Sequence, residues 1–209
     1  HSHEHDHGDD HDHGQPSEHT YETTPANLLY EQLDFPKVTT LNEDQSGSGE
    51  AILKKTWAER LDPEPLLESD ADEQILMTVP FTGQVRLQSI LLRSSDSPSA
   101  PSTLKVFINR DDLDFSSAEE LSATQEFELA RTNDIQEYPV KRALFNNTRS
   151  LSLFFTENFG QGEEDVTHLY YVAFKGEFMK LSKEPVSFLY EAAANPADHK
   201  PIVSASKGV

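Results

Sequence analysis

The chain has 209 residues and a formal net charge of −20, from 17 Lys and Arg against 37 Asp and Glu, and it contains no cysteine. Such an acidic surface repels phosphate backbones and anionic headgroups, which argues against nucleic-acid and membrane binding. Without cysteine there is no disulfide framework and no Cys-x-x-Cys redox pair. No apolar run approaches the roughly 18 residues of a membrane-spanning helix.

Residues 1–20 are rich in His and Asp and almost free of apolar side chains, so we expect a disordered tail. Imidazole binds Zn, Ni and Cu, and a flexible chain can wrap one ion. The tail is therefore a candidate metal site with the ligands His1, His3, His5, His7, His11 and His13. No apolar signal core precedes the domain, which predicts a protein of the cytoplasm and nucleus.

Residues 21–44 form a second segment, in which Leu28, Leu29 and Leu33 recur at helical spacing after Thr24-Pro25. This pattern predicts a short helix, or an arm laid on the domain. The composition of residues 42–50 indicates a loop. Residues 51–58 are predicted to form a strand or extended segment that carries the only tryptophan, Trp57.

From residue 72 onward, apolar and polar side chains alternate in one short run after another, which indicates half-buried strands. The runs are Ile75/Met77/Val79, Val85/Leu87, Leu104/Val106/Ile108, Phe127/Leu129, Leu151/Leu153/Phe155, Tyr170/Val172/Phe174 and Val186/Phe188/Tyr190. Ile90, Leu91 and Leu92 break the alternation, which predicts a bulge near Ser89 or a strand buried on both faces.

Turn-forming residues separate these runs. They include the polar loop 94–102, the acidic segment 109–120 with space for one helical turn, and the glycine-bearing loop 158–164. The pattern predicts an all-β antiparallel sandwich or jelly roll over residues 45–200. A domain of this length buries enough surface for one core. We expect a flexible tail at 201–209.

Four motifs occur in a characteristic order along residues 41–200. They are Glu68–Gly83 (ESDADEQILMTVPFTG), Asn158-Phe159-Gly160, Tyr170–Phe178 (YYVAFKGEF) and Tyr190–Lys200 (YEAAANPADHK). Together they resemble the PITH family, whose name stands for proteasome interaction in thioredoxin-like proteins. The resemblance implies a galactose-binding-like jelly roll that docks onto the 26S proteasome or an associated complex. Because a thioredoxin pair is absent, the chain is similar to the stand-alone members.

Two sets of residues are candidates for partner binding. The stretch Asn195, Pro196, Ala197, Asp198 and His199 matches a family hallmark and has little bulk for a core, so it either caps the sandwich or presents backbone to a partner. Trp57 and Phe81 lie near loops, where an aromatic ring either plugs the end of a sandwich, the commoner role, or anchors a partner.

Catalysis has little support, because the chain has no Gly-x-Ser-x-Gly elbow, no phosphate-binding glycine loop and no His-Glu-x-x-His. We read His168 as a surface or structural strand histidine, and expect a monomer with no enzymatic activity and no cofactor. Two acidic blocks, 70–73 and 111–114, lack the spacing of a known calcium loop. Two further functions stay open: a small-molecule or glycan-binding module, and metal binding through the tail.

Overall fold

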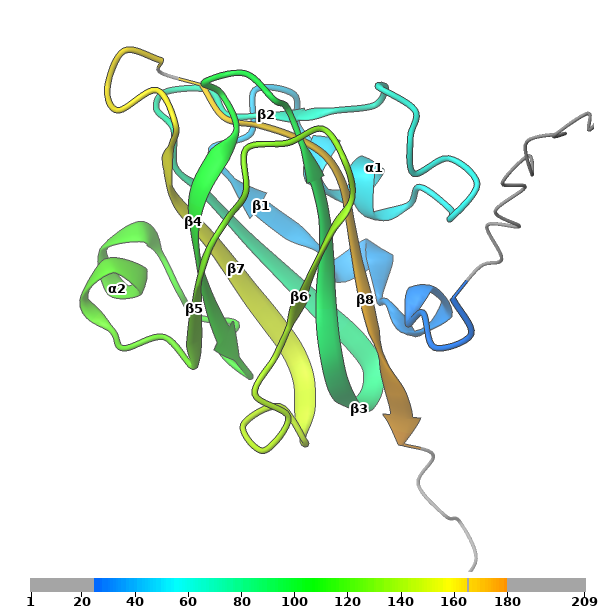
Figure 1. Ribbon diagram of the computed structural model, residues 1–209. Coiled ribbons are helices and arrows are strands. Elements are labelled where there is room, and N and C mark those ends of the chain that lie inside the picture. The colour runs from blue at the N-terminus through cyan, green and yellow to red at the C-terminus, as the bar shows by residue number, and fades with distance from the viewer. Residues whose placement is uncertain (1–24, 165, 180–209) are drawn as a thin grey trace, which may run out of the picture.

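The computed structural model describes residues 25–164 and 166–179, which form a sandwich of antiparallel strands with short helices (Figure 1). The strands are β1 (Thr39–Leu41), β2 (Leu67–Glu68), β3 (Ile75–Ser94), β4 (Pro101–Ile108), β5 (Gln125–Glu128), β6 (Gln136–Pro139), β7 (Thr148–Asn158) and β8 (His168–Met179). The helices are α1 (Ser48–Leu53) and α2 (Phe115–Glu120), and the 3-10 turns are η1 (Tyr30–Gln32) and η2 (Phe35–Lys37).

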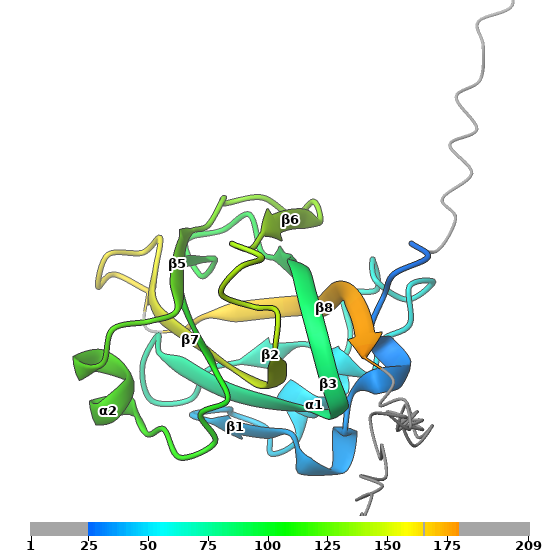
Figure 2. The ribbon, with the colours of Figure 1, turned by 90° about the horizontal axis from the view of Figure 1, so that it is seen from below.

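The long strand β3 belongs to both layers of the sandwich. Its first half pairs with β1 and β7, and its second half pairs with β6 and β8. The register with β7 shifts between Pro80 and Val85, and Figure 2 shows the two halves of β3 diverging at a bend. One layer is thus β1-β3-β7-β4-β5, and the other is β6-β3-β8-β2.

The main core lies between the layers, where the inward-facing side chains of the alternating runs meet. It includes Ile75, Met77, Val79, Val85, Leu87, Leu104, Val106, Leu151, Leu153 and Phe155. The predicted alternation is confirmed in these strands. Residues of the opposite faces of β3 and β7 are buried as well, because Leu76 and Phe154 pack with Ala118 of α2 in a second cluster.

The run Ile90–Leu92 shows both features that the sequence left open. The register between β3 and β8 shifts between Leu87 and Ser89, which confirms the predicted bulge. All three residues of the run are also buried. An extra residue in one strand moves the following side chains to the other face, so two-residue periodicity cannot continue across this point.

A similar shift affects the predicted run Tyr170/Val172/Phe174. The register between β3 and β8 shifts between Arg93 and Ser94, so that Leu169 takes the core position instead of Tyr170. Tyr170 is only partly buried, and the guanidinium of Arg93 lies 5.1 Å from the centre of its ring. The prediction was therefore wrong for Tyr170 and is confirmed for Val172 and Phe174.

Of the two possibilities that the sequence left open, a short helix or an arm laid on the domain, the described residues from 25 onward form an arm with two 3-10 turns. Leu28 and Leu33 form isolated bridges with Lys175 and Phe81, and the Leu29 amide donates to the Phe174 carbonyl at 2.9 Å. The three leucines are spaced as in a helix, but each pairs with a strand of the sandwich instead. Tertiary contacts therefore override the weak local preference for a helix. The expected boundary at residue 44 falls after β1, which is already a strand of the sandwich.

The strand or extended segment predicted for residues 51–58 is also wrong, because α1 begins at Ser48 and is followed by turns. The carboxylate of Glu43, outside the helix, accepts from the amides of Gly47 and Gly49 at 2.6 and 2.9 Å. It thus satisfies amides that a helix start leaves unpaired. In the described residues, no helix has the length and apolarity needed to cross a membrane.

Candidate functional site

The segment between α1 and β2, residues 54–66, is called here the Trp57 loop. It appears in cyan on the right of Figure 1. Backbone turns shape part of the loop, since the Glu59 amide donates to the Thr56 carbonyl at 3.0 Å and the Asp62 amide to the Glu59 carbonyl at 2.9 Å. Buried side chains supply the rest of its support. Lys55 is 4% exposed, and its ammonium donates to the carbonyls of Asp62 and Tyr170, both at 2.8 Å. Burial, assisted by the positive charge of Arg93, lowers the pKa of Lys55.

Two arginines complete this support. The guanidinium of Arg93 donates to the carbonyls of Asn133 at 3.0 Å and Asp62 at 3.4 Å. Arg60 donates to the Trp57 carbonyl at 2.6 Å and lies 4.3 Å from the centre of the indole ring. Both arginines are buried. Because a buried charge is costly unless it is hydrogen-bonded, these contacts hold the loop in one conformation.

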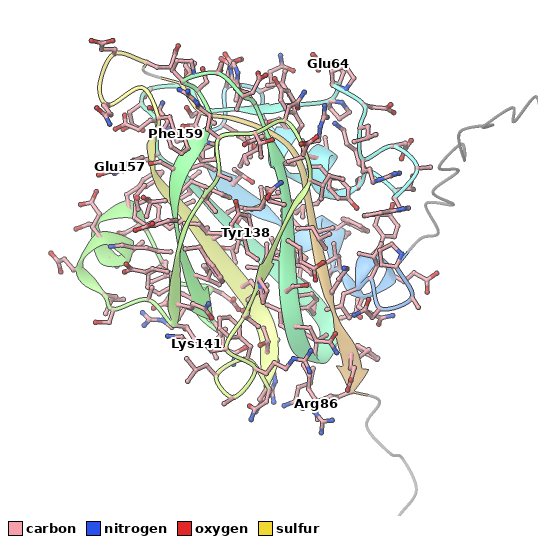
Figure 3. The ribbon with its side chains drawn as sticks, in the orientation of Figure 1. Glu64, Arg86, Tyr138, Lys141, Glu157 and Phe159 are labelled. Carbon is pink, nitrogen blue, oxygen red and sulfur yellow. The ribbon has the colours of Figure 1, made fainter. Side chains whose placement is uncertain are left out.

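The consequence is a division of charge between the inside and the outside of the loop. Its buried cations face inward, whereas the carboxylates of Glu59, Asp62 and Glu64 are exposed. Figure 3 shows Glu64 at the upper edge of the molecule. Leu61 is 52% exposed, which leaves a large apolar side chain in solvent beside the half-buried indole.

Trp57 forms a ridge between two surface pockets. The larger pocket, of about 580 Å³, is lined by the indole, by Thr56 and Ala58, and by arm residues that include Leu28 and Tyr30. The other, of about 390 Å³, is lined by the indole, Arg60, Leu61, Leu91, Asp134, Ile135, Glu137 and Lys175. We call Trp57, Leu61 and these two pockets the Trp57 surface.

The indole nitrogen Nε1 is buried and has no hydrogen-bond partner in the described part of the chain. A buried donor without a partner lowers stability by about 1–3 kcal/mol. Because Nε1 is covered, it offers no donor to a partner in this structure. The features that suit the anchor interpretation of Trp57 are its half-buried ring, the exposed Leu61 and the flanking pockets.

The structure places Phe81 elsewhere. Its side chain is 7% exposed, belongs to the main core, and lies 5.8 Å from the ring of Phe174 in an edge-to-face arrangement. Leu33 of the arm pairs with it across an isolated bridge. Phe81 thus joins arm and core, and its ring is not available to a partner in this structure.

The other candidates fall partly or wholly outside the described residues. Asn195–His199 lie beyond residue 179, and the tail histidines at positions 1–13 lie before residue 25. Within the described ranges, no group of three or more His, Asp or Glu side chains could hold a metal ion. The acidic blocks have local roles: Asp72 accepts from Asn42 and from the Gln74 amide, and Asp114 caps α2.

His168 lies at the start of β8, next to β2. Its Nε2 is 2.8 Å from a carboxylate oxygen of Glu68, and this contact is an ion pair only when the imidazole is protonated. The residue fits the strand position that the sequence predicted.

Comparison with known proteins identifies the family. The PITH domain family model matches residues 19–194. The PITH domain-containing protein P35G2.02 of Schizosaccharomyces pombe is 38% identical over 185 residues, covering 87% of this chain and 88% of its own. The Drosophila melanogaster protein CG6153 is 37% identical over 202 residues, covering 96% and 93%. PITH domain-containing protein 1 of Homo sapiens is 38% identical over 175 residues, covering 82% and 80%.

The chain therefore belongs to the PITH domain family, and the predicted resemblance is confirmed. Among solved structures, a fucolectin from striped bass serum has a TM-score of 0.52 and 11% identity, covering 74% of this chain and 49% of that chain. A family 32 carbohydrate-binding module from C. perfringens NanJ, in complex with galactose, has a TM-score of 0.49 and 6% identity, covering 71% and 97%. The likeness to the fucolectin supports the jelly-roll β-sandwich that the sequence predicted. Because one fold serves many functions, the sugar ligands of those proteins do not transfer to this one.

Proposed function

We propose that this chain is a non-catalytic docking module that binds a protein partner, the 26S proteasome or an associated complex, through the Trp57 surface. The observation that carries the proposal is an exposed leucine beside an indole on a loop held by three buried cations. The choice of partner rests on the family resemblance.

The Trp57 surface has the composition that concentrates binding energy. Tryptophan and arginine are enriched among the residues that dominate interfaces, and they act best in sites that exclude water. A loop already held in one conformation loses little entropy when a partner binds. Covering Trp57 and Leu61 would remove apolar area from water, and the exposed carboxylates around them would form the polar rim.

The proposal extends to the rest of the predicted properties. We propose a monomer without enzymatic activity, working in the cytoplasm and nucleus, with Asn195–His199 as a second contact for the same partner. The family membership and the acidic composition support this description. Binding of metal by the His-rich tail stays a prediction from the sequence.

The test is capture of partners from native lysate by the tagged full chain, scored by mass spectrometry. Trp57→Ala and Leu61→Ser should each reduce the recovery of proteasome subunits at least tenfold, since central anchors often contribute about 2 kcal/mol or more. Leu121→Ser is the matched control, because Leu121 is also exposed, at 37%, but follows α2 on the opposite side of the sandwich (Figure 1).

Thermal melting of each variant separates lost binding from lost folding. Proteasome subunits recovered equally by all four proteins would remove the Trp57 surface from the proposal. Their absence even with the unaltered chain would refute the proposed partner. A further chain lacking residues 190–209 tests the second contact, which predicts weaker recovery than with the full sequence.

A further inference from the structure

A second surface, of opposite charge, lies at the end of the sandwich away from Glu64. Figure 3 shows Arg86 and Lys141 at this lower end. Lys141 and Arg142 lie in the connection between β6 and β7, Arg149 lies near the start of β7, and Arg86 lies on β3. All four are exposed. We call these four residues, with Leu144, the basic end.

The cations of the basic end are unusual for this protein. Among the described residues, the side chains of Lys141, Arg142 and Arg149 have no ion pair or hydrogen bond, and Arg86 only approaches Glu177 at 3.7 Å, with both side chains more than half exposed. Most other described cations are buried or paired with a nearby carboxylate: Lys37, Lys54, Lys55, Arg60, Arg93, Arg110 and Lys175. Three unpaired cations and the weakly paired Arg86 thus gather at one end of a chain with a net charge of −20, which makes this end a candidate site for an acidic ligand.

The backbone under these side chains is well held. The Leu87 amide donates to the Phe145 carbonyl at 3.0 Å, and the Phe145 side chain is fully buried. Asn109 donates to the Asn147 carbonyl at 3.0 Å and accepts from the Arg149 amide at 2.7 Å. The connection is thus fixed at both ends to β3 and to the segment after β4. This arrangement leaves Leu144 47% exposed among the cations.

We propose that the basic end binds an acidic segment of a partner protein, with an apolar side chain of that segment resting on Leu144. The ligand class follows from charge and size. At physiological ionic strength, a charge is felt over about 8 Å. A short acidic segment can stay within that distance of the four cations, whereas a long nucleic acid or an anionic membrane would also meet the acidic body of the protein.

The basic end is separate from the Trp57 surface. Arg86 and Leu91 belong to the same strand, five residues apart, and Leu91 lines a pocket of the Trp57 surface. At about 3.3 Å per residue, the two positions are roughly 16 Å apart along β3. One partner, or two, can therefore occupy both surfaces. Binding of an acidic segment at the basic end is therefore independent of which protein binds at the Trp57 surface.

The experiment measures binding of a fluorescent synthetic peptide, in which Glu alternates with Leu, to the full chain by anisotropy. We expect affinity that falls as salt rises, and a loss of about tenfold in the triple variant Lys141→Gln, Arg142→Gln, Arg149→Gln, since three exposed ion pairs are removed. A peptide with Gln in place of Glu should bind at least tenfold more weakly. Leu144→Ser should also weaken binding of the acidic peptide.

The matched control removes three positive charges elsewhere, with Lys37→Gln, Lys54→Gln and Lys105→Gln, and should bind the peptide like the unaltered chain. Trp57→Ala should do the same, which keeps this test independent of the proposed function. Equal losses in both triple variants would reduce the effect to net charge and overturn the proposal. So would tighter binding of phosphatidylserine vesicles or single-stranded RNA than of the peptide. Melting curves and the retained affinity of Lys141→Arg exclude misfolding as the cause.

Discussion

At the scale of single residues, Tyr171 shows how burial controls chemistry beneath the Trp57 loop. Its side chain is 2% exposed and lines a small gap of about 20 Å³ together with Trp57 and Leu53. Burial raises the pKa of Tyr171 from 10.0 to about 12, with Arg60 acting weakly in the opposite direction. The folded state therefore keeps the phenol neutral at a pH where the unfolded chain ionises it.

We predict that Tyr171→Phe makes the protein less sensitive to alkali. Because the folded pKa lies above the unfolded value, the phenol's contribution is complete below pH 10 and is lost as the pH rises toward 12. The loss amounts to roughly 2–3 kcal/mol in the free energy of unfolding. Urea denaturation of both proteins at several pH values checks this, with measurements near neutral pH as the baseline. Parallel curves across the alkaline range would contradict it.

At the scale of elements, the arm and β8 approach each other closely where a glycine is required. The Gly176 amide donates to the Asn27 carbonyl at 2.9 Å, and the Leu29 amide reaches the neighbouring Phe174 carbonyl. A Cβ at position 176 would lie 2.4 Å from the carbonyl oxygen of Arg86 and 3.0 Å from the Leu29 side chain. The arm and the edge of the larger Trp57 pocket therefore depend on this contact.

Gly176→Ala should accordingly lower the free energy of unfolding by about 1–3 kcal/mol, the usual cost of forcing an extra group into a packed site. Hydrogen exchange at the Leu29 amide should accelerate, because the arm is displaced from β8. Thr82→Ala is the control: Thr82 is exposed on the neighbouring β3, and we expect a change within about 0.5 kcal/mol. Equal stability of the two variants would show that the backbone adjusts to the added methyl group.

At the scale of the whole molecule, repulsion between the many carboxylates lowers the stability of the folded state. The whole chain carries a net charge of −20, and few of the carboxylates in its described part have a cation within ion-pair distance. Self-repulsion of this kind keeps a protein soluble but destabilises its folded state. A negative field of this kind favours the approach of positively charged groups, and the basic end is a local exception to it.

Added salt should therefore stabilise the protein. Between about 0.01 and 0.1 M monovalent salt, the screening length falls from roughly 30 to 10 Å. We expect the melting temperature to rise by about 2–4 °C over this range, the shift that roughly 1 kcal/mol produces in a chain of this size. Calorimetry at matched pH checks the effect, and sucrose at equal osmolality controls for exclusion from the surface. A flat or falling melting temperature would show that repulsion is not limiting.

Several elements could be predicted from local pattern because their determinants are local. Ile75, Met77 and Val79 alternate as an amphipathic strand requires. The three consecutive apolar residues Ile90–Leu92 interrupt this alternation and predicted the bulge near Ser89. The helix α1 was missed because its start is capped from outside by Glu43. The basic end was missed too, since cations at positions 86, 141, 142 and 149 meet only when β3, β6 and β7 are assembled.

The sequence by itself determined the family, the all-β class and most core strands, because ordered motifs and two-residue periodicity can be read along one chain. Only the tertiary structure decided the role of each aromatic ring and each cation. The Phe81 side chain lies in the main core, whereas the Trp57 side chain lies at the surface between two pockets. Lys55 turned inward to bind the carbonyl of Tyr170, 115 residues away. The physical reason is that burial and pairing of a side chain depend on which distant backbone folds against it, and local pattern does not contain that information.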